Sequence, residues 1–142
     1  MRIILITTLI GLCAVTAYAA SDADTLATAG ILNTTWAMDC SKPPSKDNYY
    51  LLDGSKPDGA GTETQRTTSD DTRTIRNAQI ISDQWLIFTY LTRKKEEYSI
   101  LTKREGNRKK SWWSIRAGNK PLIMNGKFVA SSAEVPWFEK CK

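Results

Sequence analysis

The side chains best suited to bind a charged partner gather in one basic run in the last third of the chain. Residues 103–110 contain one acid and five cations, which are Lys103, Arg104, Arg108, Lys109 and Lys110. A run of this kind can attract phosphate groups, acidic polysaccharide or anionic lipid headgroups. It is equally typical of a solvated hairpin turn whose charge prevents aggregation at a sheet edge. We take the five cations as candidates for an anionic-surface site and keep the solvated turn as the alternative.

Nucleic acid is a poor match for these charges. A second basic turn, residues 93–95, is followed at once by Glu96 and Glu97, and we expect it at the opposite end of the fold. The whole chain of 142 residues carries a net charge of only +5. Because a phosphate backbone needs a continuous cationic stripe, the sequence argues against nucleic acid as a partner.

Groups for catalysis are sparse. The chain has no histidine, which removes the commonest general base and the commonest metal ligand. The closest carboxylate pairs are sequence neighbours in polar surroundings, where such groups are ordinarily solvated: Asp70 with Asp71, Glu96 with Glu97, and Asp22 with Asp24. No glycine-rich phosphate loop is present. We therefore predict that the protein is not an enzyme and uses no cofactor or metal.

An aromatic set in the second half of the chain could instead line an apolar cavity. If strands run through this region, alternation places five side chains on one consistent face: Trp85, Ile87, Tyr98, Ile100 and Trp113. Plain core packing is the alternative, because a domain of this size needs several large residues inside.

The N-terminal residues predict export. Residues 1–20 have the form of a secretory signal peptide, with Arg2, an apolar run, and the small residues Ala17 and Ala19 at a cleavage site. The apolar run is too short to span a membrane. Residues 21–30 are small and polar and are expected to form a flexible arm. The expected location is the periplasm or the outside of the cell.

Two cysteines remain once Cys13 is removed with the signal peptide, namely Cys40 and Cys141. In an oxidising compartment they are expected to form a disulfide. Their bond would bring the first strand to the last residues, so we also expect Trp36 and Trp137 to be buried where the two ends meet.

Residues 31–142 predict a single all-β domain. Short runs rich in β-branched and aromatic residues alternate with Gly, Pro, Asn and Asp clusters. We expect strands at 34–39, 48–53, 61–67, 72–82, 84–92, 96–104, 109–117 and 122–129. Short links, among them Asn125-Gly126, favour pairing of consecutive strands. The predicted fold is an antiparallel eight-stranded up-and-down barrel, closed by a disulfide between its N-terminal and C-terminal ends.

Two stretches carry a resemblance to known proteins. Residues 33–36, Asn-Thr-Thr-Trp, resemble the opening of lipocalin-type chains, in which a first-strand tryptophan plugs the closed end of the barrel, often beneath a basic residue from the last strands. Residues 36–45 together with 136–141 resemble small exported bacterial proteins of uncharacterised function. The resemblance implies a lipocalin-like barrel and an exported location.

Two functions follow as expectations. The first is a binding protein that holds an apolar or amphipathic small ligand inside the barrel. The second is an interaction barrel of the protease-inhibitor type, which would contact an exported protein through its N-terminal arm and mouth loops. An open mouth favours the first, and a filled interior favours the second.

Overall fold

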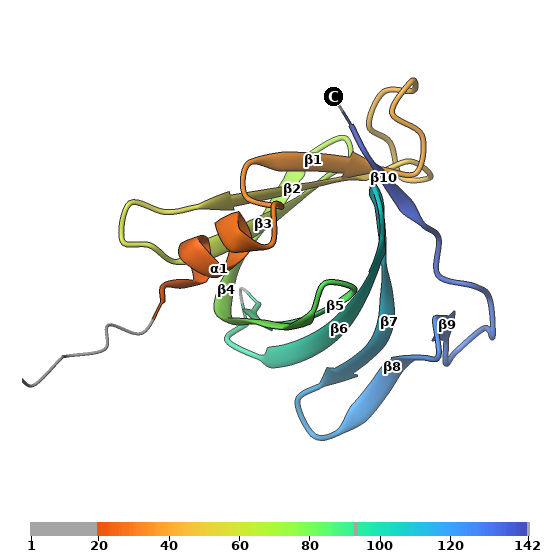
Figure 1. Ribbon diagram of the computed structural model, residues 1–142. Helices are drawn as coiled ribbons and strands as arrows, with labels where there is room; N and C mark the ends of the chain where they lie inside the picture. Colours follow the sequence, from red (N-terminus) through yellow and green to blue (C-terminus); the bar gives the residue numbers. More distant parts are fainter. Residues whose placement is uncertain (1–19, 93, 142) are drawn as a thin grey trace, which may run out of the picture.

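The computed structural model describes residues 20–92 and 94–141 (Figure 1). The predicted signal peptide, residues 1–20, lies outside this range apart from Ala20. The elements in chain order are α1 (Asp22–Thr28), β1 (Thr34–Ala37), β2 (Tyr50–Ser55), β3 (Gly61–Arg66), β4 (Asp70–Ser82), β5 (Trp85–Leu91), β6 (Glu97–Glu105), β7 (Arg108–Arg116), β8 (Lys120–Met124), β9 (Lys127–Phe128) and β10 (Phe138–Lys140). Within these ranges no helix is long and apolar enough to cross a membrane.

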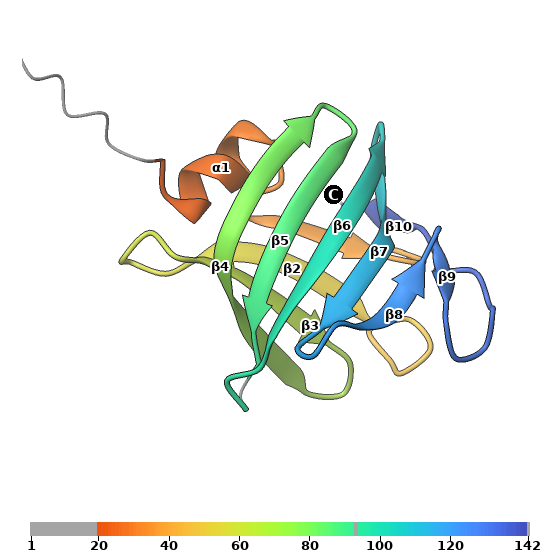
Figure 2. The same ribbon diagram turned by 90° about the horizontal axis from the view of Figure 1, so that it is seen from below.

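Eight antiparallel strands close into a barrel, as the sequence predicted (Figures 1 and 2). Strands β1 to β7 pair in chain order, and β10 closes the ring by pairing with β1 on one side and β7 on the other. Most links are short turns, so each strand lies beside its sequence neighbour.

The identity of the eighth strand is a correction. Residues 122–129, predicted as one barrel strand, form the hairpin of β8 and β9 outside the closed ring. Asn125 and Gly126 both have positive φ, 52° and 73°, and reverse the chain there. A Cβ on Gly126 would lie only 3.1 Å from the Lys110 Nζ. The edge of β7 is therefore divided: Arg108 and Lys109 pair with β10, and residues 114–116 pair with β8.

The predicted disulfide is confirmed. Cys40 and Cys141 are bonded, with their Cα atoms 5.5 Å apart. The Cys141 N–H also donates to the Thr35 carbonyl at 2.8 Å. The closing strand β10 has only three residues. A bond that spans 101 residues of sequence adds about 4 to 5 kcal/mol on the chain-entropy model, which compensates for so short a strand.

The expected flexible arm is wrong, because residues 22–28 form α1, which packs across one end of the barrel (Figure 2). Ser21 and Asp24 cap the helix reciprocally, and the Asp22 carboxylate accepts from the Ala78 N–H at 2.9 Å. Leu26 is buried in the core. Seven residues are too few to show a helical period in the sequence, so tertiary packing decides this element.

The apolar core lies at the end that α1 covers. Leu26 and Ile31 join Trp36, Ile75, Leu86 and Phe88 in one cluster. Trp36 is 1% exposed, as expected of a plug. Trp137 is not a plug. It is half-buried on the outer side of the barrel, beneath the cations of Arg108 and Lys110.

Replacing the buried helix residue tests this packing. Leu26→Ala should lower the free energy of unfolding by about 2 to 5 kcal/mol, because it leaves a cavity in the core. Urea titration of the oxidised protein measures the change. Ile81→Ala is the control: Ile81 is 57% exposed, so its loss should stay within about 0.5 kcal/mol. Equal effects of the two changes would contradict a docked helix.

Candidate functional site

A buried ionic cluster occupies the middle of the barrel. The Lys109 Nζ, from β7, lies 2.6 Å from the Asp53 carboxylate of β2 and 3.9 Å from the Glu63 carboxylate of β3. The Trp36 indole N–H donates to the same Asp53 oxygen at 2.8 Å. The Lys109 ammonium also lies 4.9 Å from the centre of the Trp36 ring. All four side chains are buried, so one lysine holds two acids and a tryptophan in place.

Glu63 is the less satisfied acid of this cluster. Its distance to Lys109 is long, and burial raises its pKa above the ordinary value of 4.5. Tyr90 hydrogen bonds to Glu63, and burial raises the pKa of this tyrosine as well. Tyr90 therefore stays protonated and can donate to the carboxylate.

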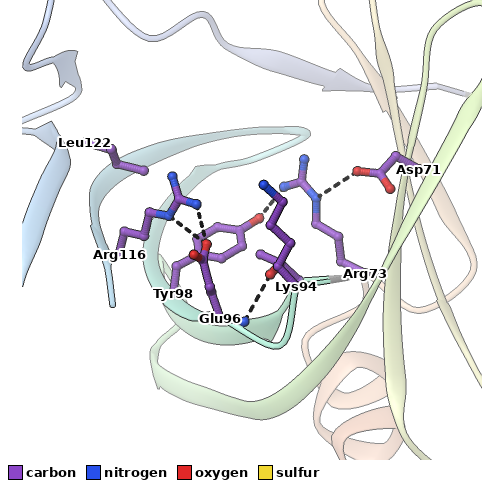
Figure 3. Close-up of a pocket in the computed structure, with 8 residues that line it drawn as sticks. Asp71, Arg73, Lys94, Glu96, Tyr98, Arg116 and Leu122 are labelled. Atoms are coloured by element: carbon purple, nitrogen blue, oxygen red, sulfur yellow. Dashed lines mark hydrogen bonds and ion pairs between the residues drawn. The ribbon is translucent and has the colours of Figure 1, made fainter. Parts of the chain in front are cut away.

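A cavity of about 440 Å³ opens at the end of the barrel away from α1 (Figure 3). Its walls combine three cations, two acids, a tyrosine, a threonine and a leucine: Arg73, Lys94, Arg116, Asp71, Glu96, Tyr98, Thr92 and Leu122. Leu122 reaches the rim because it is the extra residue of a β-bulge between β7 and β8. We take this open mouth as the candidate site.

Arg73 forms the floor of the mouth. It donates to the Tyr98 hydroxyl and, at 2.6 Å, to the Gln65 side-chain oxygen. The Asp71 carboxylate lies 3.9 Å from its Nε (Figure 3). Burial raises the pKa of Tyr98 to about 12. The Tyr98 oxygen already accepts from Arg73, so its own O–H is left to donate toward an acceptor in the cavity.

The opposite wall carries a second arginine. Arg116, from the end of β7, is paired with Glu96, and hydrogen bonds from Arg116 hold the pKa of Glu96 below its ordinary range. Lys94 points toward the same cavity (Figure 3), and within the described residues it makes no ion pair. Among the described residues that line it, the mouth thus carries one more cation than acids, which favours an anionic group.

Beneath the mouth lies a smaller cavity of about 100 Å³. Arg73 lines both spaces, and Glu63, Lys109, Tyr90 and Ile100 line the inner one. It has room for roughly three waters. The barrel interior is therefore largely filled, and its centre is ionic. Among the described residues no cluster of potential metal ligands is found.

The five predicted cavity residues do not share one face. Tyr98 and Ile100 point inward, opposite buried Tyr90 and Phe88. Trp85 and Ile87 alternate with the buried residues of β5 and point outward. Trp113 pairs with Leu101 on the outer face, beside a bulge. The alternation within each strand was predicted correctly. Alternation alone cannot say which face of a strand points into the barrel, and the bulge in β7 shifts the alternation there by one residue.

The five cations of the predicted basic tip do not share one surface, because alternation along β6 and β7 points them to different sides of the barrel wall. Lys109 is 3% exposed and Lys110 is 8% exposed. Arg104 is half-buried and donates to the Ala29 carbonyl. Outside the barrel, Lys103 and Lys110 lie over Trp112, and Lys110 and Arg108 lie over Trp137. These cations hold strands and the C-terminal segment together.

Sequence reasoning missed the residues that shape the interior, which are Asp53, Glu63, Arg73 and Arg116. Glu63 and Arg73 stand opposite each other in register on β3 and β4. A signal was present: charged residues interrupt the predicted strands 48–53, 61–67, 72–82 and 109–117, which carry these side chains and Lys109. Without the register, an inward charge cannot be told from an outward one.

Removing the central lysine tests the ionic cluster. Lys109→Met should lower the free energy of unfolding by about 3 to 5 kcal/mol, because Asp53 and Glu63 would remain buried without their cation. Lys103→Met is the matched control, since Lys103 pairs with the half-exposed Glu105 and such pairs contribute less than about 1 kcal/mol. Chemical unfolding at neutral pH measures both. Similar losses of unfolding free energy in Lys109→Met and Lys103→Met would contradict a central role for the Lys109 ion pairs.

The raised pKa of Glu63 predicts a pH dependence. A raised pKa means that the folded state binds the proton more tightly, so the stabilisation is complete below 4.5 and is lost as pH rises through the folded pKa. Compared with Glu63→Gln, the wild-type protein should therefore lose stability between acidic and mildly alkaline pH. Urea titrations at several pH values measure this difference. Exposed Glu97→Gln should show no such trend, and a flat Glu63 difference would refute the prediction.

The fold shows a closed barrel with an ionic interior. No protein-family model matches the chain, and neither curated proteins nor solved structures show a significant similarity to it. The functional argument therefore depends on the site itself.

Proposed function

We propose that this chain is an exported, non-enzymatic binding protein for a small amphipathic ligand with an anionic group. The ligand enters the open mouth rather than the barrel centre. The anionic group lies against Arg73, Tyr98 and Arg116, and the apolar part lies along Leu122 at the rim. The space of about 440 Å³ suits a small molecule.

The Tyr98 hydroxyl carries this proposal. Arg73 occupies its oxygen as an acceptor, so its hydrogen points to another acceptor, and the cavity is where that acceptor can come from. Carboxylate and phosphate oxygens accept such bonds strongly. The adjacent guanidinium groups of Arg73 and Arg116 supply complementary charge. A purely apolar ligand would offer no acceptor to the Tyr98 hydroxyl hydrogen.

The disulfide supports export, since such bonds persist in oxidising compartments. The position of Lys109 over Trp36 supports the lipocalin resemblance. In that family a basic residue often lies over the first-strand tryptophan.

The largely filled interior favours the protease-inhibitor alternative, but this alternative loses its main structural support, the protruding arm. It required residues 21–31 to protrude as an arm. In the structure these residues are folded as α1 and the following turn, and Leu26 and Ile31 are buried.

Four ten-carbon probes of equal chain length test the ligand class: decanoate, decyl phosphate, decanol and decyltrimethylammonium. We expect decanoate and decyl phosphate to bind, measured by isothermal titration below their micelle concentrations, and the other two to bind at least about tenfold more weakly. Tyr98→Phe should weaken decanoate binding by roughly ten- to a hundredfold, the usual value of a hydrogen bond to a charged group.

Two matched substitutions control this experiment. Tyr50→Phe removes a hydroxyl that donates to loop carbonyls on the outside. Arg66→Gln breaks the exposed Arg66–Asp70 pair, whereas Arg116→Gln breaks a similar pair at the mouth. Only the mouth variants should change affinity. Equal binding of decanol and decanoate, or unchanged affinity in Tyr98→Phe, would reject the proposal.

A further inference from the structure

The β8–β9 hairpin exposes an apolar surface outside the barrel wall. Four of its large side chains are at least a third exposed: Leu122 (45%), Met124 (48%), Phe128 (37%) and Val129 (48%). Both views show β8 and β9 at the periphery of the barrel (Figures 1 and 2). Phe128 is paired with buried Ile123, and both line the inner cavity, which leaves Leu122, Met124 and Val129 as the outward apolar side chains. Exposed apolar side chains that lie together on a small protein mark an interaction site.

Cations outnumber acids around this hairpin, where Arg116 pairs with Glu96, Lys127 pairs with Glu134, and Lys120 adds a further positive charge. Residues 116–133 contain Arg116, Lys120 and Lys127 and no acid. The next acid along the chain, Glu134, lies 3.4 Å from Lys110 and 3.7 Å from Lys127. Apolar side chains and cations therefore share this surface. Such a surface suits a partner with an apolar interior and negatively charged groups at its boundary with water.

The hairpin is held firmly against the barrel. The Gly126 N–H donates to the Trp112 carbonyl at 2.8 Å, and the Val135 N–H donates to the Gly126 carbonyl at 2.8 Å. Gly126 packs so closely on Lys110 and Trp112 that a Cβ would come within 3.2 Å of both. The exposed side chains are thus presented on a fixed turn.

We propose that the β8–β9 hairpin docks this protein onto an anionic lipid surface. Its apolar side chains would enter the interfacial region, and Lys120, Lys127 and Arg116 would face the headgroups. A second copy of the chain is a poorer occupant. A two-fold contact through this patch would bring Lys120, Lys127 and Arg116 of each copy together, and the nearby acids Glu96 and Glu134 are already paired with Arg116 and Lys127.

Docking also orients the mouth. Arg116 and Leu122 belong to the cavity wall, so the mouth lies beside the docked surface and opens near the headgroups. Met124, Val129, Lys120 and Lys127 do not belong to the residues that line the mouth, so variants of these four test docking separately from the proposed ligand.

Vesicle flotation tests the inference with the disulfide-bonded protein. We expect binding to phosphatidylcholine vesicles that contain about one third phosphatidylglycerol, little binding to pure phosphatidylcholine, and a loss of binding as salt rises toward 1 M, where the Debye length shrinks to about 3 Å. Lys120→Gln with Lys127→Gln should lower the partition coefficient roughly thirtyfold, since each such cation contributes about a factor of five. Met124→Ser with Val129→Ser should lower it about tenfold or more.

Matched pairs elsewhere on the protein serve as controls. Ile80→Ser with Ile81→Ser removes two isoleucines that are 41% and 57% exposed on β4. Lys42→Gln with Lys46→Gln removes two lysines far from the hairpin in the sequence. Lys42 is ion-paired with Asp39, which matches the pairing of Lys127 with Glu134. Both controls should bind vesicles like the wild type, and all variants should keep its melting temperature within a few degrees.

Several outcomes would overturn the inference. One is that the protein does not bind anionic vesicles at low salt. Another is that the hairpin variants and the control variants lose vesicle binding equally. Sedimentation of the protein without vesicles measures whether it forms a dimer. A dimer that Met124→Ser with Val129→Ser dissociates, together with absent vesicle binding, would assign the hairpin to a second copy instead.

Discussion

The Lys109 ammonium inside the barrel is the interaction on which the rest of the structure depends. It joins Asp53 of β2, Glu63 of β3 and the ring of Trp36 on β1 to β7. Strands β1 to β3 lie on one side of the short β10, and β7 lies on its other side. The ion pairs therefore connect the two parts of the barrel wall where the backbone hydrogen bonds between strands are fewest. A buried lysine with imperfectly paired acids is costly, which makes this centre sensitive to any loss of a partner.

The ionic centre also divides the barrel into two functional halves. Below it, α1 and Ile31 seal the end with an apolar cluster. Above it, Arg73 and Tyr98 form the floor of the open mouth. Because the centre is filled with charges that hold one another, a ligand has little space beneath Arg73. The proposed binding chemistry is thereby confined to the rim, where Arg116 and Leu122 stand beside the β8–β9 hairpin.

The divided edge of β7 explains why that hairpin is outside the wall. The ring closes through two β7 residues and the disulfide-anchored β10, so β8 pairs only with the far half of β7. A strand freed from closing the barrel can expose apolar residues that a barrel strand would bury or alternate. Fold closure and the presence of an exposed apolar surface are therefore two results of the same arrangement.

The sequence by itself determined the fold class, seven of the eight barrel strands, the disulfide and the burial of Trp36, because β-periodicity, turn residues and cysteine count are local or countable signals. It did not determine which face of β5 points inward, where Lys109 goes, or that residues 22–28 are helical. Those depend on register, bulges and packing between distant segments. Single-residue parity assigns Trp85 and Leu86 to opposite faces but cannot say which is inside, and only the closed tertiary structure decides this.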